Sequence, residues 1–184
     1  MISLQKGQKV NLKKEDQTLK ELQVGLGWDT RTDLDSMAFL FDTNGKLKET
    51  VYFGDQKHKG IFLNGDNLTG QGDGDDEIIT VNLEQLPSWV QKISFGANIF
   101  AAKIKLWGVK DFSQVKGAYI RIVNSITNQE ICRYSLSNIG KGFHAFYFAD
   151  LIRTSSGEWE FVAIGKGMNG SVSSIGTQLE KENL

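Results

Sequence analysis

The chain has 184 residues, of which 40% are hydrophobic and 10% aromatic, so it can bury a substantial core within one domain and is not a disordered segment. Its 21 basic and 22 acidic residues nearly balance, and the basic residues form no cluster of the kind that binds nucleic acid. A single cysteine excludes an internal disulfide, and the lack of a charged leader or a long apolar run predicts a cytoplasmic protein with no integral membrane segment.

The hydrophobic residues follow the two-residue period of β-strands along most of the chain. Alternation over residues 23–28 predicts a strand. A buried run at 37–41, followed by Asn44-Gly45 and a second run at 47–53, predicts a hairpin with a tight turn. Branched and aromatic residues predict further strands at 78–83, 90–99, 118–123, 130–134, 143–148 and 159–164. Short helical turns are expected at 83–89 and 111–115.

About nine strands with few helical segments favour an all-β fold, a two-sheet β-sandwich with acidic glycine-rich loops and one or two short helical turns. The only proline, Pro87, marks no linker, so we expect a single domain over residues 1–170. Residues 171–184 are polar and are expected to form a loose tail, in which 177–184 can form a short helix.

The segment 64–77 combines five acidic residues with four glycines and contains no lysine or arginine. Two unit charges about 4 Å apart repel by roughly 4 kcal/mol at an effective dielectric constant of 20, so the carboxylates cannot crowd together without a counter-charge. Either the segment extends into water or a cation binds it. A second acidic cluster at 29–35 precedes the predicted hairpin, and the two clusters would share one site if they met at one end of the sandwich.

The donor atoms in both clusters are hard oxygens, and glycines allow sharp turns, which together favour Ca²⁺ over Mg²⁺. Zinc and copper are poorly supported because Cys132, His58 and His144 are far apart in the sequence. An EF-hand is excluded because Ile78 stands where that loop needs glycine. The alternative is that each cluster is a solvated turn. The candidate calcium ligands are Asp29, Asp33, Asp35, Asp66, Asn67, Asp73, Asp75, Asp76 and Glu77.

Several ordered motifs in the chain resemble the TerD-domain family of bacterial tellurite-resistance and general stress proteins. The motifs are Gly25-Leu26-Gly27-Trp28-Asp29, Asp33-Leu34-Asp35, the segments 65–70 and 72–77, Ala118 to Asn124, Arg133-Tyr134 and 157–161. This resemblance implies a two-sheet β-sandwich that binds calcium through its acidic loops and acts in stress and tellurite-resistance systems. The chain departs from the family pattern at Thr32, where Asn is usual, and at Ser135, where Asp is usual.

No serine motif for nucleophilic catalysis is present, and the Gly-x-Gly-x-x-Gly sequence at 165–170 lies too close to the end of the chain to open a dinucleotide-binding unit. Cys132 and His144 lie in predicted strands and are interpreted as packing and structural residues. We therefore expect a calcium-binding protein that is not an enzyme and works as a binding or scaffold module, with other stress or tellurite-resistance proteins as partners. The alternatives are a metal-dependent hydrolase or a calcium-dependent membrane- or sugar-binding module.

Overall fold

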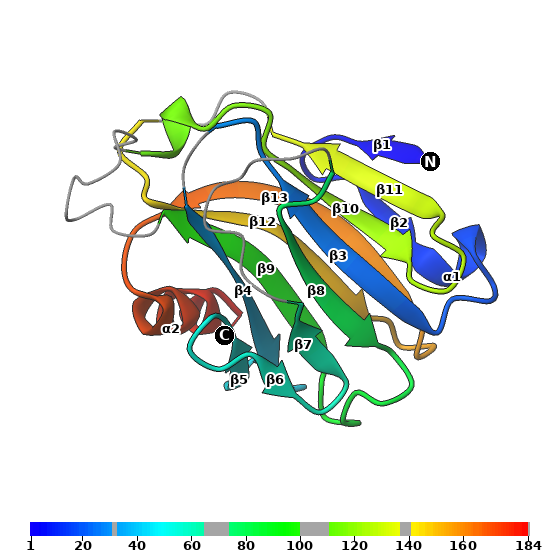
Figure 1. Cartoon of the computed structure of the whole chain (residues 1–184). Helices are drawn as coiled ribbons and strands as arrows, with labels where there is room; N and C mark the ends of the chain where they lie inside the picture. Colours follow the sequence, from blue (N-terminus) through cyan, green and yellow to red (C-terminus); the bar gives the residue numbers. More distant parts are fainter. Residues whose placement is uncertain (31–32, 65–73, 100–110, 137–140, 184) are drawn as a thin grey trace.

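In a computed structural model, two β-sheets pack face to face and enclose the core (Figure 1). The structure describes residues 1–30, 33–64, 74–99, 111–136 and 141–183. This architecture confirms the prediction of an all-β, two-sheet sandwich. No helix in those ranges has the length and the apolar character needed to cross a membrane.

One sheet has seven strands in the order β1-β11-β10-β3-β8-β7-β6. All of its neighbouring strands are antiparallel except β1 and β11, which run parallel. The strands are β1 Ile2–Leu4, β3 Glu21–Gly27, β6 Lys57–His58, β7 Ile61–Leu63, β8 Glu77–Asn82, β10 Tyr119–Asn124 and β11 Glu130–Ser135.

The other sheet has six antiparallel strands in the order β2-β13-β12-β9-β4-β5. These strands are β2 Lys9–Asn11, β4 Leu34–Phe41, β5 Leu47–Val51, β9 Lys92–Ile99, β12 Ala145–Arg153 and β13 Trp159–Met168. The long strands lie where hydrophobic periodicity predicted them. The short strands β1, β2, β6 and β7 were not predicted, because two or three residues are too few to establish a period.

The predicted hairpin joins β4 to β5 in the six-stranded sheet. Its turn depends on Asp42, whose carboxylate accepts hydrogen bonds from the backbone N–H groups of Asn44 and Lys46. Gly45 has φ of +74°, in the left-handed region that glycine adopts without a steric cost. The Asn-Gly signal therefore predicted both the turn and the pairing of the strands beside it.

Two of the short helical segments have side-chain caps at their N-termini. The helix α1 spans Leu12–Glu15 and is capped by Asn11, whose side chain accepts from the Lys14 N–H. The 3-10 helix η1 spans Phe112–Gln114 and is capped by Asp111 in the same way, as predicted for 111–115. Residues 83–89 form hydrogen-bonded turns, in one of which the Leu86 N–H donates to the Asn82 carbonyl as in a single turn of α-helix, but no helix forms there.

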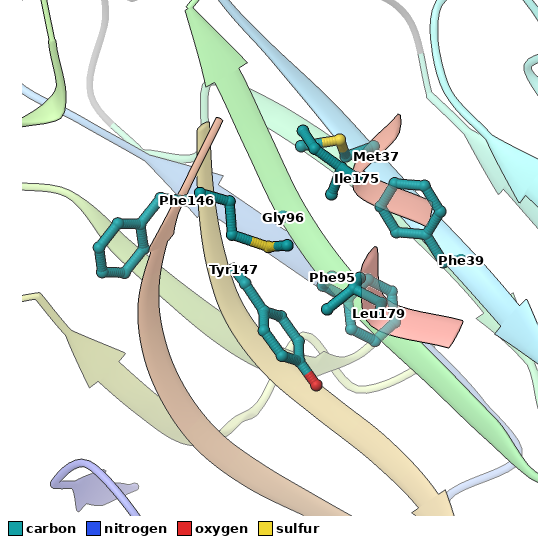
Figure 2. Close-up of a pocket in the computed structure, with 9 residues that line it drawn as sticks. Met37, Phe39, Phe95, Gly96, Phe146, Tyr147, Ile175 and Leu179 are labelled. Atoms are coloured by element: carbon teal, nitrogen blue, oxygen red, sulfur yellow. The ribbon is translucent and has the colours of Figure 1, made fainter. Parts of the chain in front are cut away.

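The helix α2, Val172–Asn183, covers part of the outer face of the six-stranded sheet (Figure 1). It includes the helix considered within 177–184, whereas the expectation of a loose tail is wrong for residues 172–176. Gly176 allows a close approach, because a Cβ atom there would lie 3.1 Å from the Phe39 ring. Figure 2 shows Ile175 and Leu179 of α2 above Met37 and Phe39. The second hydrophobic cluster formed in this way contains Met37, Phe39, Phe41, Ala145, Tyr147, Met168, Ile175 and Leu179. The domain boundary at residue 170 stays a prediction.

Replacing Leu179 with alanine is expected to lower the free energy of unfolding by about 2–4 kcal/mol, because the side chain is 2% exposed and its loss leaves a cavity against the sheet. Urea denaturation measures the change. The exposed neighbour Lys181 provides the control, since Lys181→Ala is expected to change stability by no more than about 0.5 kcal/mol. Equal effects of the two substitutions would mean that α2 does not fold with the sandwich.

Candidate functional site

The described candidate ligands lie at the end of the sandwich where β3 ends and where β4 and β8 begin. Asp76 binds the end of β3 twice: its backbone N–H donates to the Leu26 carbonyl at 2.8 Å, and its Oδ2 accepts from the Trp28 N–H at 2.8 Å. Glu77 reaches the opposite sheet, where its Oε2 accepts from the Ser36 N–H at 2.6 Å. The segment 75–77 therefore contacts segments of both sheets.

Burial and like charge act together at this end. Burial raises the pKa of Asp76, and the negative charges of Asp75 and Asp29 raise it further, against the hydrogen bond from Trp28. Asp35 and Glu77 are 4% and 2% exposed. Several carboxyl groups therefore share a poorly solvated region in which each additional ionised group costs free energy.

Asp29 and Asp33 lie at the two ends of the connection from β3 to β4. The Asp29 backbone N–H donates to the Lys116 carbonyl at 2.8 Å, and its carboxylate occupies the space beside Gly117, where a Cβ atom would lie 1.9 Å from Oδ2. Asp33 is half-buried immediately before β4, which contains Asp35. Asp29 and Asp33 thus lie at the same end of the sandwich as Asp76.

The structure places six of the nine candidate ligands: Asp29, Asp33, Asp35, Asp75, Asp76 and Glu77. The other three, Asp66, Asn67 and Asp73, lie outside the described residues. Among the residues that are described, no three His, Cys, Asp or Glu side chains form a group arranged to hold a metal ion. Calcium binding therefore stays a prediction, which depends on the hard-oxygen chemistry of the donors and on the convergence of the segments 28–36 and 75–77.

Asp75 has a counter-charge that the local sequence did not indicate. The Arg121 Nε of β10 donates to Asp75 Oδ1 at 2.7 Å, and the Tyr119 hydroxyl lies 2.9 Å from the same oxygen. The side chain of Asp75 is 4% exposed and that of Arg121 is 25% exposed. An arginine from a neighbouring strand therefore balances part of the negative charge of the acidic segment.

The ion pair continues across the outer face of the seven-stranded sheet. Arg121 also donates to Glu130 at 2.8 Å, and Arg133 contacts both carboxylate oxygens of Glu130, at 2.9 and 2.8 Å. The Arg133 guanidinium lies over the Tyr119 ring, 4.2 Å from its centroid. The hydrogen bonds from Arg133, and then those from Arg121, hold the pKa of Glu130 below its ordinary value. Two carboxylates and two guanidiniums thus alternate in one network.

Two glycines of β3 make room for this network. A Cβ atom on Gly25 would lie 2.0 Å from Asp75 Oδ2, and one on Gly27 would lie 2.3 Å from the Tyr119 ring. Gly25 is paired with Arg121 in the register of β3 and β10, and Gly27 is paired with Tyr119. The Gly-Leu-Gly sequence therefore provides a flat surface on which the side chains of the network lie.

Sequence reasoning missed the roles of Tyr119, Arg121, Glu130 and Arg133. The available signal was alternation: Tyr119 and Arg121 are separated by the fully buried Ile120, so both point to the outer face of β10. The ion pair between Arg121 and Asp75 could not be found in this way, because it depends on Asp75 lying against β3.

Two residues with reactive side chains were assigned structural roles. Cys132 lies in β11, as predicted, whereas His144 is exposed and lies just before β12, so its structural role stays a prediction. Cys132 is fully buried, and burial, followed by the charge of Glu130, raises its pKa to about 12, so its thiolate is scarce at neutral pH. The His144 Nδ1 lies 2.9 Å from Asn169 Oδ1, which joins the start of β12 to the end of β13.

Removing Arg121 tests the network. Arg121→Met leaves the Asp75 carboxylate without its cation and is expected to lower the free energy of unfolding by about 2–3 kcal/mol, less than for a fully buried pair because Arg121 is partly exposed. The double variant Arg121→Met with Asp75→Asn is expected to lose less free energy of unfolding than the single Arg121 variant. Urea denaturation in the presence of a chelator measures both.

Lys9→Met provides the control, because it removes a cation from an exposed pair with Glu160 and is expected to cost no more than about 1 kcal/mol. A double variant whose loss equals the sum of the two single losses would mean that Asp75 and Arg121 are not coupled.

Comparison with known proteins gives one consistent result. The family model described as TerD domain matches residues 1–178. The chain is 42% identical over 188 aligned residues to General stress protein 16U of Bacillus subtilis (strain 168), covering 96% of this chain and 95% of that protein. It is 38% identical to Tellurium resistance protein TerD of Serratia marcescens, with 96% of each chain covered.

The fold agrees with a solved structure. A homologue of telluride resistance protein (TerD) from Streptomyces coelicolor A3(2) superposes with a TM-score of 0.70 over 88% of this chain and 98% of that chain, at 24% identity. That likeness concerns the fold alone, whereas the family model and the two sequence relatives span nearly the whole chain. The chain therefore belongs to the TerD domain family, whose named members include tellurium-resistance and general stress proteins.

Proposed function

We propose that this protein is a calcium-binding member of the tellurite-resistance and stress-response family and that it acts as a non-catalytic binding or scaffold module. The proposed ion site lies at the end of the sandwich where residues 28–36 meet residues 75–77. The described candidate ligands there are Asp29, Asp33, Asp35, Asp75, Asp76 and Glu77, and Asp66, Asn67 and Asp73 are retained from the sequence.

The raised pKa of Asp76 is the observation that carries the proposal. Burial and the charges of Asp75 and Asp29 make it costly to ionise this side chain, although its Oδ2 accepts a backbone hydrogen bond from Trp28. A divalent cation beside these groups would lower that cost. The oxygen donors match the preference of Ca²⁺ for carboxylate and amide oxygens.

The charge balance of the region points the same way. Arg121 is engaged by Asp75 and Glu130 on the outer face of the sheet, so it balances one carboxylate of the acidic segment. Asp76 and Glu77 instead accept hydrogen bonds from the backbone N–H groups of Trp28 and Ser36. A cation bound among these carboxylates would offset the repulsion between their negative charges.

The same contacts support a binding or scaffold role. Asp76 and Glu77 each join the acidic segment to another strand through a backbone N–H group, so a cation at this end would fix the relative positions of three chain segments. Catalysis is the competing hypothesis. Calcium-dependent turnover of phosphoester or glycoside substrates, absent from Asp76→Asn, would replace the scaffold role by that of a hydrolase.

Calcium is expected to raise the melting temperature of chelator-stripped protein, because a ligand that binds only the folded state stabilises it. If the dissociation constant is about 10 µM, 1 mM Ca²⁺ supplies about 2.7 kcal/mol, which corresponds to a rise of roughly 5–10 °C for a domain of this size. Differential scanning calorimetry and isothermal titration with Ca²⁺, and with Mg²⁺ for comparison, measure the effect.

Asp76→Asn and Asp73→Asn are each expected to weaken calcium binding at least tenfold. Glu84→Gln serves as the matched control, because it removes one carboxylate beyond the other end of β8 and should leave binding unchanged. Identical melting curves of the unsubstituted protein with and without Ca²⁺ would rule out the proposal.

The raised pKa of Asp76 also leads to a prediction about pH that does not depend on a bound metal ion. Its folded-state pKa is raised, so its contribution to stability is fully present below the ordinary value of 3.8 and is lost as the pH rises through the folded-state pKa. In the presence of a chelator at pH 7, Asp76→Asn is therefore expected to melt at a higher temperature than the unsubstituted protein, and the difference should shrink as the pH falls. The direction assigned to the pKa shift would be wrong if the advantage in melting temperature of Asp76→Asn over the unsubstituted protein were smaller at pH 7 than at pH 5.

A further inference from the structure

A second candidate site lies at the opposite end of the sandwich from the acidic residues. It is a cleft of about 290 Å³, close to the lower size limit of small-molecule sites. The segments around it are α1, the residues before β3, the residues after β8 and the turn from β12 to β13. The acidic segment contacts the end of β3 and the start of β8, so the length of these strands separates the two sites.

The floor of the cleft is apolar, whereas its walls carry charged and polar side chains. Leu12, Leu19 and Trp159 are buried beneath it, and the half-buried Leu83 packs against the same core. An indole ring beside aliphatic side chains can bury the hydrocarbon or aromatic part of a small molecule.

The polar groups of the cleft are mostly engaged with one another. Lys20 is paired with Glu84 at 3.1 Å, and Glu158 accepts from the Asn11 side chain at 2.9 Å. Lys13 donates to the Gln17 carbonyl at 2.5 Å. Lys13 thus keeps its charge on the rim, whereas Arg153 is the one guanidinium among the described residues of the lining.

Arg153 is positioned by contacts that do not neutralise it. Its guanidinium lies 5.1 Å from the centroid of the Trp159 ring, and its Nη1 donates to the Ser88 carbonyl at 3.3 Å. In the part of the chain that the structure describes, its Nε is buried with no hydrogen-bond partner, and it forms no ion pair with a carboxylate. A guanidinium has five N–H donors arranged to bind a carboxylate through two of them, so Arg153 has donors to spare.

We propose that this cleft binds a small organic carboxylate with an apolar body. The carboxylate pairs with the Arg153 guanidinium, and the body lies against Trp159 and the leucines beneath it. As far as the structure describes it, the lining carries three cations, Lys13, Lys20 and Arg153, against the two carboxylates Glu84 and Glu158, and this excess of positive charge favours an anion. The proposal is independent of calcium binding, because no candidate calcium ligand lines the cleft.

Titration with 4-phenylbutyrate tests the proposal, with 4-phenylbutanol as the uncharged analogue and acetate as the analogue without an apolar body. Indole N–H signals in ¹H–¹⁵N correlation spectra report binding, and Trp159→Phe identifies the signal of Trp159 among the four tryptophans. We expect 4-phenylbutyrate to shift that signal with a dissociation constant on the order of 1 mM, and the two analogues to bind at least five-fold more weakly.

Arg153→Gln is expected to weaken the binding of 4-phenylbutyrate at least five-fold, whereas the binding of 4-phenylbutanol is expected to stay unchanged. Lys20→Gln is the matched control, because it removes the same charge from the rim of the same cleft and is expected to weaken binding less than two-fold. The melting temperature and the signal dispersion of each variant verify its fold.

Three results would overturn the proposal. The first is the absence of a shift of the Trp159 signal at 20 mM 4-phenylbutyrate. The second is equal affinity for the acid and the alcohol, which would mean that the cleft takes apolar molecules without regard to charge. The third is an equal loss of affinity in Arg153→Gln and Lys20→Gln, which would indicate general electrostatic attraction.

Discussion

The ion pair between Asp75 and Arg121 determines how a strongly acidic segment can join a packed sandwich. A carboxylate that is almost completely buried needs a nearby positive charge, and Arg121 of β10 provides it. The pair fits because Gly25 has no side chain at the point where the carboxylate crosses β3. This contact holds Asp75 in place, and the side chains of the next two residues, Asp76 and Glu77, are positioned from it.

The two ends of the sandwich differ in chemical character. At one end Asp35 and Glu77 are buried, and Asp76 and Glu77 accept hydrogen bonds from backbone N–H groups. At the other end a guanidinium stacks on an indole above an apolar floor, with lysines and glutamates around it. A β-sandwich suits such an arrangement, since its strands are rigid and the loops at each end can vary independently.

Much of the fold could be predicted from local sequence, whereas the environment of the candidate site could not. The long strands and the Asn44-Gly45 turn were found because periodicity and turn chemistry act over a few residues. The helix α2 was underestimated because its apolar residues, Ile175 and Leu179, are few, and they are stabilised by a sheet that the local sequence does not show. The acidic segments were correctly identified as unusual. The role of Arg121 remained hidden because 46 residues separate it from Asp75.

The order of the strands in the six-stranded sheet has a consequence for biosynthesis. The strands β12 and β13 are translated after β2, β4, β5 and β9, yet they lie between β2 on one side and β9, β4 and β5 on the other. The strand β2 cannot pair with its neighbour until residues 159–168 have been translated, and β1 must likewise wait for β11. Nascent chains therefore carry exposed strand edges until these later strands are made, and such intermediates are natural clients for molecular chaperones.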